Sequence, residues 1–497
     1  MCGIIGVTCV PAASSEVYHG LLLLQHRGQD AAGIFSFNDP APGFILHKNQ
    51  GLVDQVFKLE HLEKLKGLTA IGHTRYSTMG NQLEQDIQPL IVNYPYGIGM
   101  VHNGNIVNAQ ELVIELKEKR KRHMFGSNDL EVLLNLFADG VAKNAHFGQI
   151  EFSHILDAVN EIFKKAKGGY SVLSYIAHHG LVAFRDPNGI RPLILGVRDL
   201  TKSEQEASGN TLKKAYCVAS ESNALTFLGY EVVRNIEAGE VVYIKDNGEM
   251  VSAKLVENPK EVHVPCMFEW VYFANPQSEI DHINVYESRK NMGIILANEI
   301  KKMIAEKNIA PDIVAPVPET SRISAIFLAQ ELGLPYREVL TKNRYVQRSF
   351  ILNSESLRSR ALSLKFGPIL QEVQGKNILL LDDSIVRGNT SKKIVKMLKD
   401  SGAKEVYFAS ACPPVKHPCY YGIDFPDPKE LVATDRSNQK IAEFLDAEKV
   451  IYLDIDSLKK AIGRPKLCTA CLTGEYPVDI SCATKFKELR NQQRKNL

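Results

Sequence analysis

Residues 377–391 read NILLLDDSIVRGNTS, and this stretch decides the fold of the second half of the chain. Residues 378–381 are four apolar residues, a run short enough for a buried strand, and the run ends in Asp382 and Asp383. Small and polar residues follow, and an amphipathic segment then begins at Ser391. The pattern predicts a buried strand, an acidic pair, a loop and the start of a helix.

The residue types in this stretch also indicate a ligand class. Free backbone N–H groups in such a loop and at a helix start bind phosphate. Neighbouring carboxylates suit a ribose or the Mg²⁺ that accompanies a pyrophosphate. The alternative is an ordinary buried strand with two solvated acids, and the stretch alone does not separate these interpretations.

The composition of the whole chain limits the class of protein. A chain of 497 residues is long enough for two or more domains, and 44% hydrophobic with 23% charged residues is typical of a soluble globular protein. The 59 basic and 57 acidic residues nearly cancel, which argues against nucleic-acid or membrane partners. The apolar runs are short and the first residues lack a signal-peptide pattern, so we expect a cytoplasmic protein. Nine cysteines in such a chain favour metal binding or catalysis over disulfides.

The second residue is a candidate nucleophile. Removal of Met1 would leave Cys2 with both a thiol and a free α-amine, and the amine can act as a general base. Such a pair can attack an amide or ester carbonyl. The alternative is that position 2 belongs to a disordered chain end.

Three further motifs support the catalytic interpretation of Cys2. They are QHRGQDAAG at 25–33, IGHTRYSTMG at 71–80 and GMVHNGNIVN at 99–108. Together with MCG at the start of the chain, they resemble the class II, N-terminal-nucleophile glutamine amidotransferases. The resemblance implies an α+β sandwich of αββα layers in which Cys2 attacks the side-chain amide of glutamine.

The resemblance also assigns roles around Cys2. The side chain of Asn103 and the backbone N–H of Gly104 would form the oxyanion hole. Arg75 would hold the α-carboxylate of glutamine, and Asp129 would receive its α-ammonium group. Asp129 begins a predicted helix, so a plain helix cap is the alternative for that residue.

After about residue 260, helices alternate with apolar strands, which predicts a mostly parallel sheet with ligands beyond the strand ends. PVPETS at 316–321 and the stretch 377–391 mark two strand ends. The second resembles the fingerprint of type I phosphoribosyltransferases, which bind phosphoribosylpyrophosphate (PRPP). The resemblance implies PRPP binding by Asp382, Asp383, Ser384, Arg387, Gly388, Asn389, Thr390, Ser391 and Lys342, Mg²⁺ binding by Thr320, Asp382 and Asp383, and pyrophosphate beside Glu319, Thr320 and Ser321.

The segment 342–366 between these strand ends is long, basic and weakly periodic. It predicts a lid that closes over phosphate, with Lys342, Arg344 and Arg360 as candidate contacts. A loop without this function is the alternative.

Four cysteines form a candidate metal site. A CxxC pair with two distant thiols can supply four sulfur ligands to an iron–sulfur cluster or to zinc. The contexts of these cysteines resemble the cluster-bearing branch of the glutamine-dependent PRPP amidotransferases, so a [4Fe–4S] cluster is favoured over zinc. Four buried free thiols are the remaining alternative. The predicted ligands are Cys266, Cys419, Cys468 and Cys471.

The two halves in this order resemble that same family along nearly the whole chain. We predict an amidotransferase domain at 2–260, a phosphoribosyltransferase domain at 261–470, and a cluster-ligand segment with a basic tail at 471–497. The resemblance implies that glutamine and PRPP give 5-phosphoribosylamine, pyrophosphate and glutamate, the first step of purine nucleotide synthesis. Purine nucleotides as feedback inhibitors, an ammonia channel and a homotetramer are also implied.

Two other functions are the alternatives. A PRPP-sensing regulator would lack glutamine hydrolysis, and the set of Cys2, Arg75, Asn103 and Asp129 argues against it. A sugar-phosphate amidotransferase would keep the first half but have no use for the stretch 377–391.

Overall fold

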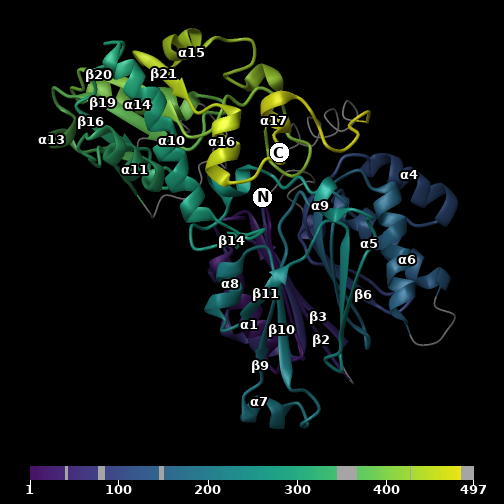
Figure 1. The fold of residues 1–497 in the computed structure, drawn as a ribbon. Helices are drawn as coiled ribbons and strands as arrows, with labels where there is room; N and C mark the ends of the chain where they lie inside the picture. Colours follow the sequence, from purple (N-terminus) through teal and green to yellow (C-terminus); the bar gives the residue numbers. More distant parts are fainter. Residues whose placement is uncertain (40–42, 77–83, 145–149, 344–365, 426, 483–497) are drawn as a thin grey trace.

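The computed structural model describes residues 1–497 apart from 40–42, 77–83, 145–149, 344–365, 426 and 483–497. Figure 1 shows a lower half built on two β-sheets and an upper half in which helices surround a smaller sheet. No helix within the described residues combines the length and the apolar character needed to cross a membrane.

The first sheet of the lower half has seven antiparallel strands in the order β11-β9-β10-β1-β4-β2-β3. Its central strand, β1, directly follows the candidate nucleophile Cys2 and is buried along its length. The strands are β1 (Gly3–Thr8), β2 (Ala31–Asn38), β3 (Gly43–Gln50), β4 (Thr69–Arg75), β9 (Ile194–Asp199), β10 (Lys214–Ala219) and β11 (Glu231–Asn235).

The second sheet has six antiparallel strands in the order β13-β12-β8-β7-β6-β5. The tight turn at 246–248 joins β12 to β13, as the Asp-Asn-Gly sequence there predicts. The strands are β5 (Leu90–Val92), β6 (Ile98–Ile106), β7 (Gly168–Ile176), β8 (Gly180–Arg185), β12 (Glu240–Lys245) and β13 (Met250–Lys254).

The two sheets face one another with little space between them. A Cβ added at Gly6 of the first sheet would lie 3.3 Å from Leu173 of the second. On the outer face of the first sheet, a Cβ at Gly72 would lie 2.5 Å from Val17 of α1 (Ala13–Leu23). Helices α5 (Asp129–Asn144) and α6 (Phe152–Lys165) pack on the second sheet. These layers confirm the predicted αββα sandwich.

The upper half is built on a parallel sheet in the order β16-β19-β20-β21. All three strand pairings in this sheet are parallel, which confirms the predicted mostly parallel architecture. The strands are β16 (Ile313–Pro316), β19 (Asn377–Asp382), β20 (Glu405–Ser410) and β21 (Lys449–Tyr452), and the helices around them are α10 (Val285–Ala305), α11 (Arg322–Leu332), α14 (Asn389–Asp400), α15 (Asn438–Leu445) and α16 (Ile455–Ile462).

Helix α14 begins at Asn389, two residues before the predicted start at Ser391. Gly388, with φ +74°, takes the N-cap position, and its carbonyl accepts the first helical hydrogen bond from the Lys392 N–H at 2.8 Å. A residue with positive φ at this point favours glycine. The earlier start adds two residues, about half a turn, to the helix at the phosphate-binding end of the predicted loop.

The remaining elements complete the described structure. Two small antiparallel pairs, β14 with β15 and β17 with β18, stand outside the main sheets. These remaining elements are α2 (Val53–Val56), α3 (Leu59–Lys64), η1 (Glu84–Asp86), α4 (Ala109–Arg120), α7 (Lys202–Ala207), α8 (Ser222–Phe227), α9 (Pro259–Val262), η2 (Glu269–Phe273), β14 (Glu279–Ile280), β15 (Ile283–Asn284), β17 (Leu340–Lys342), β18 (Phe366–Pro368), α13 (Leu370–Val373), η4 (Pro428–Glu430) and α17 (Ala470–Thr473).

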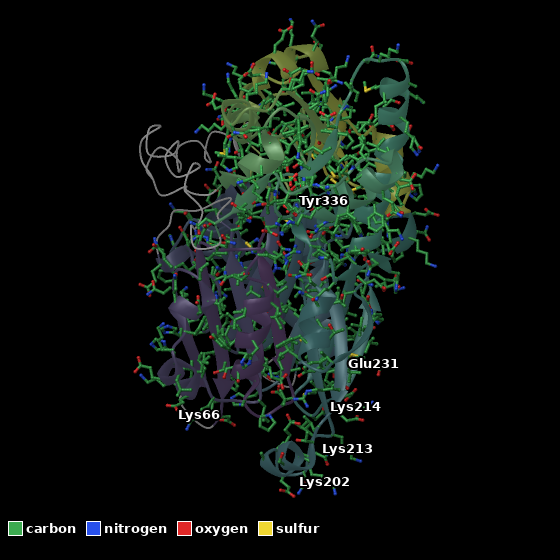
Figure 2. The ribbon with its side chains drawn as sticks, turned by 90° about the vertical axis from the view of Figure 1, so that its left-hand side faces the viewer. Lys66, Lys202, Lys213, Lys214, Glu231 and Tyr336 are labelled. Atoms are coloured by element: carbon green, nitrogen blue, oxygen red, sulfur yellow. The ribbon has the colours of Figure 1, made fainter. Side chains whose placement is uncertain are left out.

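The amino terminus lies where the two halves meet (Figure 1). Figure 2 shows Lys66 and Lys202 at the far end of the sandwich, away from Tyr336 of the upper half. The fold therefore places the start of β1 beside the upper half. The predicted domain bounds at 260 and 470 stay predictions.

The packing between the sheets generates a stability prediction. Leu173→Ala removes a fully buried side chain that faces the other sheet, so we expect a loss of about 2–5 kcal/mol in the free energy of unfolding. Urea denaturation followed by circular dichroism measures it. The matched control is Leu59→Ala, because Leu59 is 73% exposed. Equal stability of the two variants would contradict the sandwich packing.

Candidate functional site

The candidate nucleophile is held by backbone and side-chain groups from three segments. The Cys2 N–H donates to Asn103 Oδ1 at 3.2 Å, and the Tyr76 N–H donates to Cys2 Sγ at 3.4 Å. Arg27 Nε donates to the Cys2 carbonyl at 3.0 Å. The structure thus brings Cys2 and Asn103 together although 101 residues separate them.

The environment of the Cys2 thiol determines its protonation state. Burial raises the pKa of this thiol, while the positive charges of the chain's amino group and of Arg75, with the Tyr76 amide, oppose that effect. A thiol with a raised pKa stays protonated near neutral pH and needs a base to become a nucleophile. The predicted base is the α-amine that removal of Met1 would expose on Cys2.

The predicted oxyanion hole lies on the last part of β6. Asn103 is 1% exposed, and its Nδ2 has no hydrogen-bond partner within the described structure, while its Oδ1 is occupied by the Cys2 N–H. A Cβ at Gly104 would lie 2.1 Å from the Gly169 carbonyl oxygen of β7, so only glycine fits there. A buried amide donor beside a thiol suits the negative charge of a tetrahedral intermediate.

Arg75 and Asp129, the predicted glutamine-binding pair, are both buried. Arg75 ends β4, and the turn at Gly28 packs directly on its backbone. Asp129 Oδ2 accepts the Ile106 N–H at 2.8 Å, so its side chain reaches across to β6. The capping interaction of the helix belongs to Asn128, whose Oδ1 accepts the Leu130 N–H at 2.9 Å.

A buried ionic group beside Cys2 was not among the residues predicted from the sequence. The Arg27 guanidinium contacts Glu221 at 2.5 Å and Glu269 at 3.0 Å, and all three side chains are buried. Arg27 stands in the motif at 25–33, which is the one signal for it. Glu221 and Glu269 are far away in sequence, and no local pattern marks them.

The acidic pair of the second site follows β19, as predicted. The Asp383 N–H donates to Asp382 Oδ1 at 2.9 Å, and Ser384 Oγ donates to Asp383 Oδ1 at 2.7 Å. Burial raises the pKa of Asp382 well above its ordinary value, and the charge of Asp383 adds to the rise. Burial also raises the pKa of Asp383 to about 6, against the opposing effect of Ser384, Arg289 and Thr320.

Arg289 is a further residue that was not predicted from the sequence. It lies on the apolar face of α10, where its Nε donates to the Trp270 carbonyl at 2.9 Å and its Nη2 to the Ala274 carbonyl at 2.8 Å. Burial lowers its pKa to about 10, and the charge of Asp383 opposes the shift. An arginine in line with Met292 and Leu296 was the available signal, because a charge on a buried helix face needs a partner.

The remaining predicted PRPP residues lie on both sides of the acidic pair. The Thr320 side chain lies close enough to Asp383 to lower the pKa of that carboxyl, so the two predicted strand ends come together. Arg387 contacts Glu430 at 3.0 Å, outside the loop, and Glu319 contacts Arg322 at 2.5 Å. Gly388, Asn389, Thr390 and Ser391 form the cap and first turn of α14, whose first amides have no helical acceptor.

The predicted lid lies mostly outside the described residues. Arg344 and Arg360 belong to that part of the chain. Lys342 ends β17 and pairs with Phe366 of β18, so the two described ends of the segment lie side by side.

The four predicted cluster cysteines are buried and come from three segments that are bonded to each other. The Cys468 N–H donates to the Pro265 carbonyl at 2.9 Å, and the His417 N–H donates to the Cys471 carbonyl at 2.9 Å. Burial raises the pKa of Cys266 to about 11, opposed by the nearby Arg191 charge, and the pKa of Cys471 rises through burial and through the neighbouring cysteines.

The donor set of this cluster fits a thiophilic metal group, because four thiols in a water-excluded place are the ligands such a group requires. Their side chains are 4–8% exposed. Within the described residues, however, no group of three or more His, Cys, Asp or Glu side chains is close enough together to hold a metal ion. Metal binding at these cysteines therefore stays a prediction.

Comparison with known families supports both halves. Residues 73–225 match the model of a glutamine amidotransferase domain, and residues 282–441 match that of a phosphoribosyl transferase domain. These ranges include Arg75, Asn103 and Asp129 in the first half and the stretch 377–391 in the second.

Similar proteins match along nearly the whole chain. An amidophosphoribosyltransferase of Escherichia coli is 43% identical over 93% of this chain and 88% of its own. The solved glutamine PRPP amidotransferase of B. subtilis, complexed with ADP and GMP, is 36% identical, with a TM-score of 0.81 over 96% of this chain and 98% of its own. A solved allosteric regulatory enzyme of purine biosynthesis is 35% identical, with a TM-score of 0.83 over 98% and 99%.

The acidic pair generates a pH prediction. The folded-state pKa of Asp383, about 6, lies above its ordinary value of 3.8, so the folded protein binds this proton more tightly and loses stability as pH rises through 6. At pH 7.5 and without ligands, we expect Asp383→Asn to stabilise the protein by roughly 1–3 kcal/mol. At pH 4.5, between the ordinary and the folded-state pKa, we expect a smaller difference.

Thermal unfolding at the two pH values measures this effect. Asp400→Asn is the matched control, because the Asp400 side chain is 65% exposed. A melting temperature for Asp383→Asn that is unchanged or lower than that of the wild type at pH 7.5 would contradict the proposed destabilisation by the buried, ionised Asp383.

Proposed function

The chain belongs to the amidophosphoribosyltransferase family, and from that membership we propose which residues carry out each step. The enzyme catalyses the first step of purine biosynthesis, in which glutamine and PRPP give 5-phosphoribosylamine, pyrophosphate and glutamate. The observation that carries the residue assignment is the contact of Cys2 with Asn103, whose buried Nδ2 has no partner among the described residues.

In the first half-reaction, Cys2 acts as the nucleophile. After removal of Met1, the α-amine takes the proton of Sγ, and Sγ attacks the side-chain carbonyl carbon of glutamine. Asn103 Nδ2 and the Gly104 N–H donate to the oxygen that becomes negative. As this intermediate collapses, the leaving NH2 group takes the proton from the α-ammonium group and departs as ammonia. Water then hydrolyses the thioester to glutamate and regenerates the thiol.

Two charged residues select glutamine as the substrate. The Arg75 guanidinium suits the α-carboxylate, because its donors form a planar fork. Asp129 suits the α-ammonium group, because its carboxylate is buried and anchored to β6 through the Ile106 N–H. Both lie on the elements that surround Cys2, β4 and the start of α5.

In the second half-reaction, ammonia attacks C1 of PRPP, the bond from C1 to the pyrophosphate oxygen breaks, and pyrophosphate leaves. The first turn of α14 and the loop before it supply amides and hydroxyls for the 5′-phosphate. Lys342 and the segment after it would cover the bound phosphates.

Asp382, Asp383 and Thr320 would hold Mg²⁺. The raised pKa values of the two carboxyls support this assignment, because a cation that binds between two buried carboxylates removes their repulsion. When bound, Mg²⁺ offsets the negative charge of the leaving pyrophosphate.

Cys266, Cys419, Cys468 and Cys471 would hold a [4Fe–4S] cluster. Their burial, their three bonded segments and the adjacent positive charge of Arg191 suit an anionic group with thiolate ligands. Zinc is the alternative, since it accepts the same four sulfurs.

Regulation and assembly follow the family. The B. subtilis relative was solved with ADP and GMP, which supports purine nucleotides as feedback inhibitors. We also propose a homotetramer in the cytoplasm.

The two-site assignment generates a prediction for Cys2→Ala. The substitution removes the nucleophile, so we expect glutamine-driven pyrophosphate release from PRPP to fall by at least about 10³-fold, while the ammonia-driven rate stays within about twofold. A coupled pyrophosphate assay with each nitrogen source measures both rates. Cys9→Ala is the control and keeps both. Equal loss of the two rates in Cys2→Ala would contradict the assignment.

The cluster assignment generates a separate prediction. Protein purified without oxygen is expected to contain about four iron atoms and four sulfides per chain. Cys468→Ser should lose most of the iron, and Cys217→Ser, which replaces a buried cysteine of the sandwich, should keep it. Elemental analysis and visible absorption measure both. A colourless wild-type protein that holds zinc alone would contradict the cluster.

A further inference from the structure

A glycine of the upper half is seated on the backbone of the predicted oxyanion hole. A Cβ added at Gly422 would lie 3.2 Å from the carbonyl carbon of Gly104 and 3.3 Å from its Cα. The φ of Gly422 is +104°, which also favours glycine. The two main chains therefore touch without a side chain between them, although more than 300 residues separate them in the sequence.

Three buried hydrogen bonds hold the residues before Gly422 against the lower half. Asn105 Nδ2, one residue past Gly104, donates to the Tyr420 carbonyl at 3.3 Å. Arg191 Nε donates to the Tyr421 carbonyl at 2.6 Å, and its Nη2 donates to the same oxygen. A segment that is bonded at the two residues directly before its contact with Gly104 has little freedom to move away from it.

A second path leads from the same segment to the nucleophile. Arg191 lies 3.6 Å from Glu269, Glu269 contacts Arg27, and Arg27 donates to the Cys2 carbonyl. These side chains are 0–1% exposed, so the charges are not screened by water. Both the nucleophile and the oxyanion hole are thus connected to Tyr421 and Gly422.

We propose that the segment 420–422 positions the oxyanion turn 103–105, so that glutamine hydrolysis depends on residues outside the amidotransferase half. This inference rests on the proposed roles of Asn103 and Gly104. An oxyanion donor must stand about 2.7–3.1 Å from the oxygen it stabilises, so a displacement of a few tenths of an ångström weakens it. A methyl group at Gly422 would force such a displacement, because Gly104 is confined from its other side by Gly169.

The segment also reaches the cysteine cluster. The Tyr421 N–H donates to Cys419 Sγ at 3.4 Å. The segment that contacts Gly104 is therefore also bonded to one of the four buried cysteines.

The test compares Gly422→Ala with a glycine that has similar backbone geometry and free space. Gly463 has φ +80° and no heavy atom within 4 Å of an added Cβ, so Gly463→Ala is the matched control. In Gly422→Ala we expect kcat for glutamine hydrolysis to fall at least about tenfold, with KM for glutamine within about twofold. The ammonia-driven rate and the rate of Cys2 alkylation by iodoacetamide should stay at the wild-type values, and Gly463→Ala should retain every activity.

A second variant keeps the inference testable if Gly422→Ala does not fold. Asn105→Ala removes the bond to Tyr420 and should lower kcat for glutamine hydrolysis in the same selective way. Wild-type kcat in either folded variant would overturn the positioning role, as would a parallel loss of the ammonia-driven rate. A wild-type enzyme that does not hydrolyse glutamine would instead overturn the proposed function itself, and the inference with it.

Discussion

The buried guanidinium of Arg27 joins the parts on which the chemistry depends. It bonds to the Cys2 carbonyl in the lower half and to Glu269 at the start of the upper half, and Glu221 completes its partners. A buried charge is tolerated only when it is paired and hydrogen bonded, so these three contacts must form together. The position of the amino terminus is therefore set by both halves of the chain.

The second site, in contrast, contains two buried groups of like charge. Asp382 and Asp383 are neighbouring carboxyls in a buried place, and their raised pKa values express repulsion that Ser384, Thr320 and Arg289 reduce only in part. The pair is held in this place because it lies at the end of β19, whose apolar residues are buried in the core. Such a pair opposes stability in the free protein and favours a cation in the complex.

Local patterns in the sequence predicted a large part of this arrangement. The buried run before Asp382, the turn at 246–248 and the alternation of helices and strands each depend on neighbouring residues, and each is confirmed in the fold. Arg289, Glu221 and the contact of Gly422 with Gly104 depend on segments that meet only after folding. Helix α14 began earlier than predicted because Gly388 caps it. The roles of the individual site residues stay predictions.

We propose that nitrogen released at Cys2 is used at Asp382 and Asp383 within one molecule. The most direct measurement supplies amide-¹⁵N glutamine and PRPP in a buffer that contains unlabelled ammonium, and follows glutamate, pyrophosphate and the label in phosphoribosylamine. We expect equal amounts of glutamate and pyrophosphate, with the label retained in phosphoribosylamine. Glutamate formed without labelled phosphoribosylamine would contradict it.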